Sequence, residues 1–270
     1  MTAMSPSPQP IPLDAMPRTW LTSHLTELRH EMKLAKQAQA TFYPQTMPEV
    51  HGITLFAEFR PALQVSGDYY DFVRLSAHEL LFTVGDISSK GLTAALFTPL
   101  IRKVVRTALK LEPKPTPQHV LAYVNADLHD EFSQATMFAT AFIGLYDASR
   151  RQLRYVNAGQ SPVIYRPGQG KARLLKGDGL PIGVFSHSTC VEQEINLGPG
   201  DLLLVGTDGL TEVRNNTGEL FGYERLLQLI DTVGDHTPAS IAAAIFYKLT
   251  TFAAARKRED DQTLLLIKGI

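Results

Sequence analysis

The hydrophobic and polar positions of this chain change their spacing several times, which predicts strands and helices in groups. From Gly52 onward, most apolar runs are short and are bounded by turn residues, as is typical of strands. We predict strands over the ranges 53–59, 78–84, 138–146, 152–156, 163–165, 172–175, 191–197, 202–205 and 263–268. Because several of these runs follow one another through short turns, they favour antiparallel sheets.

Two pairs of helices are predicted between the strands. They cover the ranges 92–111, 117–132, 223–233 and 238–255. Thr116 is a suitable N-cap, and Pro117 fits the first position of the helix that follows it. Pro99 predicts a kink or a restart, because proline lacks a backbone donor. The pattern as a whole predicts an α+β fold, with a central β-sandwich of two antiparallel sheets flanked by helical layers (αββα).

The N-terminal part is predicted to differ from the rest. Residues 1–17 are rich in proline and serine, which indicates a disordered leader. Residues 18–47 form a second unit, built on a helix over 19–41 that precedes the sandwich. Its apolar residues fall near one face; they are Leu21, Leu25, Leu28, Met32, Leu34 and Ala35. This helix is a cap, a linker, or a short coiled coil that joins two copies or an upstream activator. Residues 48–270 are predicted to form a single domain.

Composition excludes several classes of function. The chain of 270 residues has 26 basic and 27 acidic residues, so no charge excess favours nucleic acid or an anionic membrane. No apolar run reaches the roughly 18 residues of a membrane-spanning helix, and the N-terminus lacks the features of a signal peptide. A single cysteine, Cys190, excludes an internal disulfide and is predicted to be buried. We therefore expect a cytoplasmic protein.

Four short acidic motifs carry the candidate chemistry. They are SGDYYD at 66–71, VGDIS at 84–88, GTDG at 206–209 and DDQT at 260–263. Three of them adjoin an apolar, strand-like run, where a carboxylate can point into a shared cleft. Each motif alone is typical of a turn. Four such carboxylates together would make a hard, oxygen-rich site suited to Mg²⁺ or Mn²⁺, and a pair of these ions can activate water against a phosphoester.

The order of these motifs resembles the metal-dependent protein phosphatase family (PPM, protein phosphatase type 2C-like), in its SpoIIE/RsbU branch. The resemblance covers about residues 48–270. Further segments support it; they are YVNAG at 155–159, GLPIG at 179–183 and GELFG at 218–222. It implies the same β-sandwich, with a metal cleft at one end.

The resemblance also implies the site residues. The catalytic and metal-binding set is Asp68, Asp86, Asp208 and Asp260, with the backbone carbonyl of Ile87 as a further ligand. Asp86 would bridge two Mn²⁺ or Mg²⁺ ions, and a third ion is possible in the family. Behind the ligands stand Asp71, Glu212 and Asp261, of which Asp71 is expected to fix its own loop. The histidines are scattered, and none is assigned as a ligand.

The implied activity is that of a protein serine/threonine phosphatase. The resemblance implies as substrate a phosphorylated anti-sigma-factor antagonist, a small STAS-domain protein, in a partner-switching pathway. An activator or a second copy would act through the N-terminal helix. Two alternatives remain open at this point. One is a non-catalytic phosphoprotein-binding module of the same fold. The other is a hydrolase of small phosphoesters, which the absence of a GxxxxGK loop disfavours.

The chain departs from the family pattern at several positions. Ser66 and Ser89 stand where the family often has glycine, and AGQSP at 158–162 replaces AGHNP. Ser88 and Leu63 stand where eukaryotic relatives have a histidine and an arginine. The general acid and any phosphate-binding arginine are therefore unassigned. All four core aspartates are present, so we expect an active enzyme.

Overall fold

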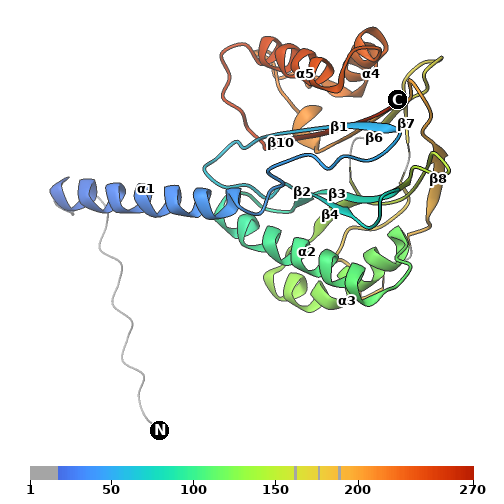
Figure 1. Cartoon of the computed structure of the whole chain (residues 1–270). Helices are drawn as coiled ribbons and strands as arrows, with labels where there is room; N and C mark the ends of the chain where they lie inside the picture. Colours follow the sequence, from blue (N-terminus) through green and yellow to red (C-terminus); the bar gives the residue numbers. More distant parts are fainter. Residues whose placement is uncertain (1–17, 161–162, 176, 188–189) are drawn as a thin grey trace.

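The protein forms four layers, in which two sheets pack face to face and a pair of helices covers each outer face (Figure 1). The computed structural model describes residues 18–160, 163–175, 177–187 and 190–270. The predicted leader, residues 1–17, lies outside these ranges. Both sheets have five strands and are antiparallel throughout. The predicted α+β sandwich is confirmed.

The first sheet contains the C-terminal strand of the chain. Its order is β1 (Ile53–Arg60), β10 (Gln262–Gly269), β9 (Leu202–Gly206), β6 (Val163–Arg166) and β7 (Arg173–Leu174). Helices α4 (Gly222–Val233) and α5 (Pro238–Ala253) cover its outer face. Alternate strand residues such as Leu204 and Leu266 pack against Leu226 and Ile245 of these helices.

The second sheet contains the strands that flank the other helix pair. Its order is β2 (Tyr69–Arg74), β3 (Glu79–Ile87), β4 (Ala139–Asp147), β5 (Gln152–Ala158) and β8 (Gln193–Asn196). Helices α2 (Leu92–Leu111) and α3 (Pro117–Ala135) lie on its outer face. Thr116 caps α3, because its side chain accepts a hydrogen bond from the backbone N–H of His119 at 3.2 Å.

Aromatic residues fill the space between the two sheets. Phe142 stacks on Phe82 with ring centroids 5.9 Å apart, and on Tyr155 at 5.2 Å. Phe82 and Phe142 are fully buried. Such offset stacks add to the free energy gained by burying the rings, so they stabilise the packing of β3, β4 and β5, which are neighbours in the second sheet. A rigid second sheet positions the side chains at its end.

Helix α1 (Arg18–Ala40) projects away from this body (Figure 1). Gln39 is its one buried residue. Leu25 and Leu28 of the predicted apolar stripe are 53% and 56% exposed. The stripe is therefore present and largely uncovered in the single chain.

Three features differ from the sequence prediction. Helix α2 runs without a break through Pro99, so the predicted restart does not occur. Residue 99 cannot donate to the carbonyl of Ala95, but the hydroxyl of Thr98 donates to that oxygen at 3.0 Å. Strand β2 was not predicted, and the bounds of the other strands differ from the prediction by up to three residues.

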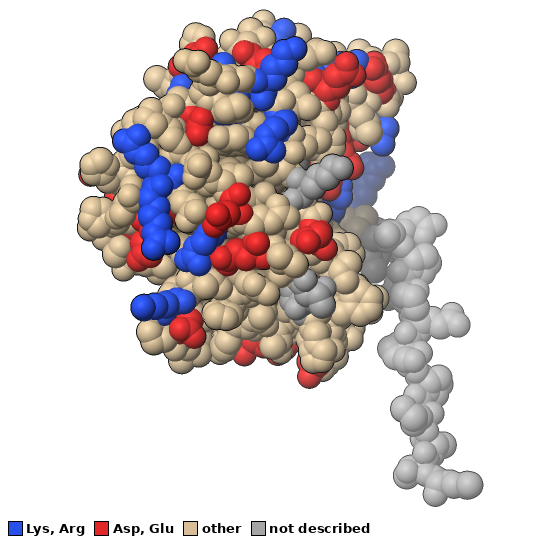
Figure 2. All heavy atoms as spheres, turned by 90° about the vertical axis from the view of Figure 1, so that its right-hand side faces the viewer, with Lys and Arg blue, Asp and Glu red and all other residues tan. Residues whose placement is uncertain are grey.

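On the face that carries β7 and β8, acidic and basic side chains are interspersed (Figure 2). Within the ranges described above, no helix combines the length and the apolar character needed to cross a bilayer. Cys190 is buried, as predicted, and burial raises the pKa of its thiol.

Candidate metal centre

The strand pairing brings the four predicted aspartates to one end of the sandwich. In the second sheet Tyr69 pairs with Gly85, which places Asp68 beside Asp86. In the first sheet Leu264 pairs with Gly206, so the start of β10 lies beside the end of β9. Asp208 follows that end of β9, and Asp260 precedes that start of β10. We call Asp68, Asp86, Asp208 and Asp260 the acid cluster.

Hydroxyl groups of the first sheet hold Asp68, although it belongs to the second sheet. Its Oδ2 accepts hydrogen bonds from the hydroxyls of Thr207 at 2.8 Å and Thr263 at 2.6 Å. Asp68 is 1% exposed. The charge of Asp86 acts on this carboxylate, since it contributes to the raised pKa of Asp68. The threonines therefore fix the orientation of a buried carboxylate at the junction of the sheets.

Burial and mutual repulsion raise the pKa values of three of the four acids. Burial, followed by the charges of Asp208 and Asp260, raises the pKa of Asp86 to about 7. Burial and the charge of Asp86 raise the pKa of Asp68 well above its usual range. The pKa of Asp208 is also raised, first by burial and then by Asp260. The protein keeps mutually repelling carboxylates together, which costs free energy unless a cation neutralises them.

Lys90 is a side-chain cation that reaches the acid cluster. Its ammonium lies 2.8 Å from Oδ2 of Asp260 and 3.0 Å from the carbonyl oxygen of Glu259. The pKa of Lys90 is raised, first by its hydrogen bond to Asp260. Lys90, which lies in the loop between β3 and α2, therefore supplies part of the positive charge that the acids require.

The donor set has the chemistry that a hard divalent cation requires, but its side chains do not converge on one point. Carboxylate and carbonyl oxygens are the ligands that Mg²⁺ and Mn²⁺ prefer. Among the described residues, no three Asp, Glu, His or Cys side chains converge closely enough in this structure to hold an ion. The charge of the cluster nevertheless calls for a cation, and Asp260 is turned to Lys90. Asp260 would have to exchange Lys90 for the ion.

Gly67 keeps the Ile87 carbonyl close to the acids. A Cβ at residue 67 would lie 3.0 Å from the backbone oxygen of Ile87 and 3.3 Å from Oδ1 of Asp86. Gly209 is similarly confined, because a Cβ there would lie 1.9 Å from the carbonyl oxygen of Asp261. These two glycines of the motifs allow the backbone to pack directly against the site.

Asp261 holds the loop that leads to Asp68. Its Oδ2 accepts hydrogen bonds from the Ser66 hydroxyl at 2.5 Å and from the Gly67 N–H at 3.2 Å. Its Oδ1 accepts from the N–H of Ala62 at 2.7 Å. The Ser66 hydroxyl, absent from a glycine, also accepts from the N–H of Asp68 at 3.0 Å. Ser66 therefore adds contacts to this loop.

The other two acids predicted to stand behind the ligands differ in burial: Asp71 is buried and Glu212 is exposed. The Asp71 carboxylate accepts two hydrogen bonds from Arg106 of α2, at 2.6 and 2.9 Å, with Arg102 at 3.4 Å. These contacts fasten α2 to β2; Asp71 lies within a strand rather than in the loop that it was expected to fix. Glu212 is exposed, and its charge raises the pKa of Asp208.

Sequence reasoning missed a polar bridge beneath the acids. Gln160 donates to the carbonyl of Gly206 at 2.7 Å and accepts from the Thr140 hydroxyl at 2.6 Å. Thr140 pairs with Asp86 in the sheet, and Gly206 lies two residues before Asp208. Gln160 therefore links the strand ends of the two sheets. The only signal for it was the replacement of histidine by glutamine in the segment 158–162.

Sequence reasoning also missed the connection from α1 to the site. Gln39 donates to the Ser66 carbonyl at 2.7 Å and accepts from the Ser66 N–H at 3.0 Å. The Tyr43 hydroxyl donates to the Asp68 carbonyl at 2.8 Å. The last turn of α1 and the segment after it thus contact the backbone of the Asp68 loop.

The chain belongs to the SpoIIE family. Residues 76–269 match the family described as stage II sporulation protein E (SpoIIE), which is well over half of the chain. Protein IcfG of Synechocystis is 31% identical over 263 residues, covering 88% of this chain and 41% of IcfG. The phosphoserine phosphatase RsbU of Bacillus subtilis is 28% identical over 195 residues, covering 72% of this chain and 57% of RsbU.

Solved structures share the fold. The SiaA-PP2C domain of Pseudomonas aeruginosa matches with a TM-score of 0.81 at 22% identity, covering 92% of this chain and 98% of that domain. RsbX in complex with magnesium matches with a TM-score of 0.60 at 17% identity, covering 83% of this chain and 99% of RsbX. The chain spans 41–58% of the length of its curated relatives.

Proposed function

We propose that this protein is a metal-dependent protein phosphatase that hydrolyses phosphoserine and phosphothreonine. The observation that carries the proposal is the acid cluster, four carboxylates that repel one another at the end of a PP2C-type sandwich. Family membership and the relatives named phosphoserine phosphatases support it.

The roles of the residues follow from their positions. Asp68, Asp86, Asp208 and Asp260 would hold two Mn²⁺ or Mg²⁺ ions, with the Ile87 carbonyl beside them. Such ions supply Lewis acidity and lower the pKa of water that attacks a phosphoester. Thr207 and Thr263 orient Asp68 through their hydroxyls.

The supporting residues hold the acids in place. Asp261 fixes the 62–67 loop, and Gln160 fixes the spacing between the two sheets. No covalent enzyme intermediate is needed, so the buried Cys190 has no catalytic role in this proposal.

The proposed substrate is a phosphorylated STAS-domain antagonist of an anti-sigma factor, in partner-switching signalling. Support comes from the relatives RsbU and RsbP, and from a structural neighbour described as the RsbU and RsbW domains of a Mycobacterium tuberculosis protein. A cytoplasmic location remains a prediction.

Phosphate release tests this function directly. A phosphoserine STAS protein and p-nitrophenyl phosphate are each incubated with the full chain in Mn²⁺ and then in EDTA. We expect turnover of both substrates, lost in EDTA because the acids need the ions. Turnover of the small ester alone would overturn the substrate assignment. Tight binding of the phosphoprotein with no turnover of either substrate would instead favour a non-catalytic binding module.

We also propose that α1 transmits a regulatory signal to the site from a second copy or an activator. The exposed leucines of α1 offer a contact surface, and Gln39 with Tyr43 connects the helix to the Asp68 loop. Sedimentation of the full chain distinguishes a second copy, which gives a dimer, from a separate activator, which leaves a monomer.

Replacing Gln39 tests this connection. Gln39→Ala removes both hydrogen bonds to Ser66, so the loop that carries Asp68 loses support. We expect kcat to fall about tenfold, as for partners that orient metal ligands. Gln37→Ala, on the exposed side of the same helix, is the matched control and should leave kcat unchanged. Equal kcat values for the two variants would argue against the connection.

A further inference from the structure

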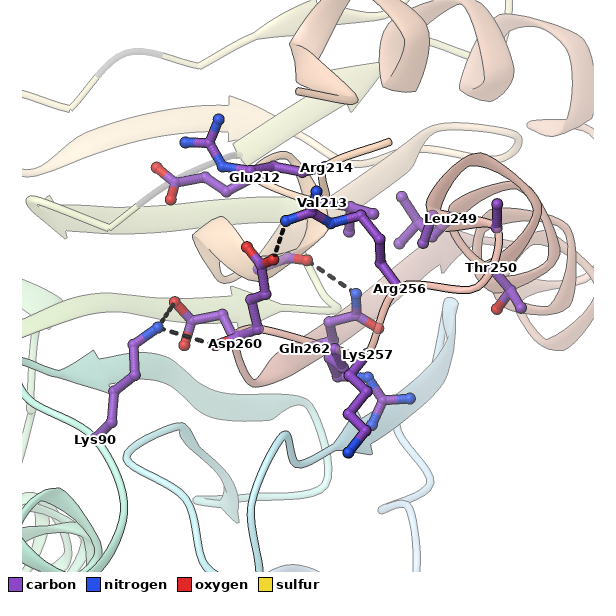
Figure 3. A pocket seen from close by; sticks show the side chains of 15 residues that line it. Lys90, Glu212, Val213, Arg214, Leu249, Thr250, Arg256, Lys257, Asp260 and Gln262 are labelled. Carbon is purple, nitrogen blue, oxygen red and sulfur yellow. Dashed lines mark hydrogen bonds and ion pairs between the residues drawn. The ribbon is translucent and has the colours of Figure 1, made fainter. Parts of the chain in front are cut away.

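A groove of about 320 Å³ opens beside the acid cluster. Its walls are the segment after β9, the last turns of α5 and the connection from α5 to β10 (Figure 3). Lys90 and Asp260 line it, and so does Gly209, which directly follows Asp208. A ligand in this groove therefore lies against Asp260 and beside the residue that follows Asp208. The volume of the groove is within the size range of protein ligand sites.

The groove carries an excess of positive charge. Five basic and three acidic residues line it. Asp260 is paired with Lys90, and Glu259 is paired with Arg256. The other charged residues of the lining are Arg214, Lys257 and Arg258 against Glu212, so positive charge remains in excess. Lys257 is exposed and, within the described part of the chain, has no hydrogen bond or ion pair. Binding of a metal would also release Lys90 from Asp260 and add to the excess.

The basic residues are held in place by the surrounding backbone. Arg256 donates to the Asn215 carbonyl at 3.5 Å, and Arg258 donates to the Pro61 carbonyl at 2.8 Å. Burial and the nearby charge of Arg60 lower the pKa of Arg258, so like charges are kept together at a cost. Arg214 donates to the Gly218 carbonyl at 3.0 Å. These contacts distinguish the region from a solvated basic tail.

The backbone that leads into the basic run is strained. Ala254, the residue after α5, has φ 52° and ψ −118°. A residue with a Cβ seldom adopts a positive φ, and strain of this kind is concentrated at binding and catalytic sites. The turn directs residues 256–258 along the edge of the groove. Apolar side chains of Val213 and Leu249 complete its lining.

We propose that this groove binds the acidic residues that flank the phosphorylated serine or threonine of a protein substrate. The phosphoryl group then lies at the acid cluster, while its neighbours along the peptide contact Arg256 and Lys257. In Figure 3, Lys90 approaches Asp260 from the α2 side, and Arg214 and Arg256 lie on the opposite side of it. The inference rests on the proposed phosphatase function and adds a substrate preference to it.

Two phosphopeptides and one charge reversal test the proposal. The full chain is assayed in Mn²⁺ with a phosphoserine peptide that has Asp and Glu on both sides, with a matched peptide that has Ala and Gly, and with p-nitrophenyl phosphate. We expect a lower KM for the acidic peptide. Lys257→Glu should raise that KM about fivefold, the scale of an exposed ion pair, with kcat unchanged. The KM values for the neutral peptide and the small ester should stay constant.

The control is Lys171→Glu, which makes the same charge change before β7 at the far edge of the first sheet. It should leave all three substrates unaffected. Equal KM values for the two peptides in the wild type, or equal effects of the two reversals, would overturn the groove assignment. So would a loss of p-nitrophenyl phosphate turnover in Lys257→Glu. Failure of the proposed function itself is distinguishable, because the wild type would then hydrolyse none of the three.

Discussion

Replacing Asp86 by asparagine is expected to abolish phosphate release while stabilising the metal-free protein. Activity falls because Asp86 is proposed to hold both ions. A bound ion contributes several kcal/mol to the transition state, so we expect a loss of about a thousandfold or more in kcat. Stability rises because burial, followed by the charges of Asp208 and Asp260, disfavours the ionised Asp86 carboxylate. Opposite effects on activity and stability are expected of a site built for a cation.

The pH dependence of this stabilisation has a defined sign. The pKa of Asp86 is raised from 3.8 to about 7 in the folded protein. Above pH 7 the folded protein therefore carries an unfavourable ionised group, and this penalty is relieved as the pH falls through 7. In EDTA at pH 8, Asp86→Asn should be more stable than the wild type by on the order of 2–4 kcal/mol. The difference should shrink towards pH 5.

Thermal unfolding in EDTA at pH 8 and pH 5 measures this effect. For a chain of this size, we expect Tm of the variant to be about 5–10 °C higher at pH 8. A variant that is less stable than the wild type at pH 8, or one that retains full turnover, would contradict the role of Asp86.

The same substitution at Asp71 is expected to have the opposite effects. Asp71 is 0% exposed and is paired with Arg106, so Asp71→Asn leaves the arginine with an incomplete partner. We expect a loss of about 2–3 kcal/mol in the free energy of unfolding, since hydrogen bonds to charged groups contribute most. Below its Tm, the variant should retain most of its metal-dependent turnover. Denaturant unfolding and phosphate release measure the two quantities.

The Asp71→Asn variant also distinguishes two roles for Asp71 in the SGDYYD motif: a structural role and a role in the metal site. If Asp71→Asn lost activity as completely as Asp86→Asn with no change in stability, Asp71 would belong to the site. The contacts with α2 predict that it does not.

The acid cluster was predictable because strand-end carboxylates mark it in the sequence. Each of the four motifs contains the acid, and several contain the small residue that admits it; Gly67 and Gly209 are confined by the backbone of the site. Thr207 and Thr263 also lie in the motifs, but their shared bond to Asp68 depends on how two distant strands meet. The spacing of residues along the chain does not specify which distant strands lie side by side.

Strand β2 was missed because its burial does not alternate. Residues 69–72 are all buried, Asp71 among them. A charged residue in a fully buried strand is stable here because Arg106 reaches it from a helix 35 residues away. The unbroken path of α2 through Pro99 has a similar cause, since the hydroxyl of Thr98 satisfies the carbonyl that proline cannot.

The contacts of α1 with the site could not be predicted from the sequence either. Apolar periodicity predicted the helix to within one residue at each end. The residue that connects it to the site is polar, although it continues the same helix face four residues after Ala35. Gln39 pairs with the backbone of Ser66, which carries no sequence signal of its partner.

Titration of the protein with Mn²⁺ by calorimetry tests the central claim most directly. The wild type should bind two ions per chain, Asp71→Asn should bind the same number, and Asp86→Asn should lose the binding. Phosphate release by the wild type should follow the occupancy. A wild type that binds no Mn²⁺ yet hydrolyses phosphoesters in EDTA would contradict the metal site, as would an Asp86→Asn variant that binds both ions like the wild type.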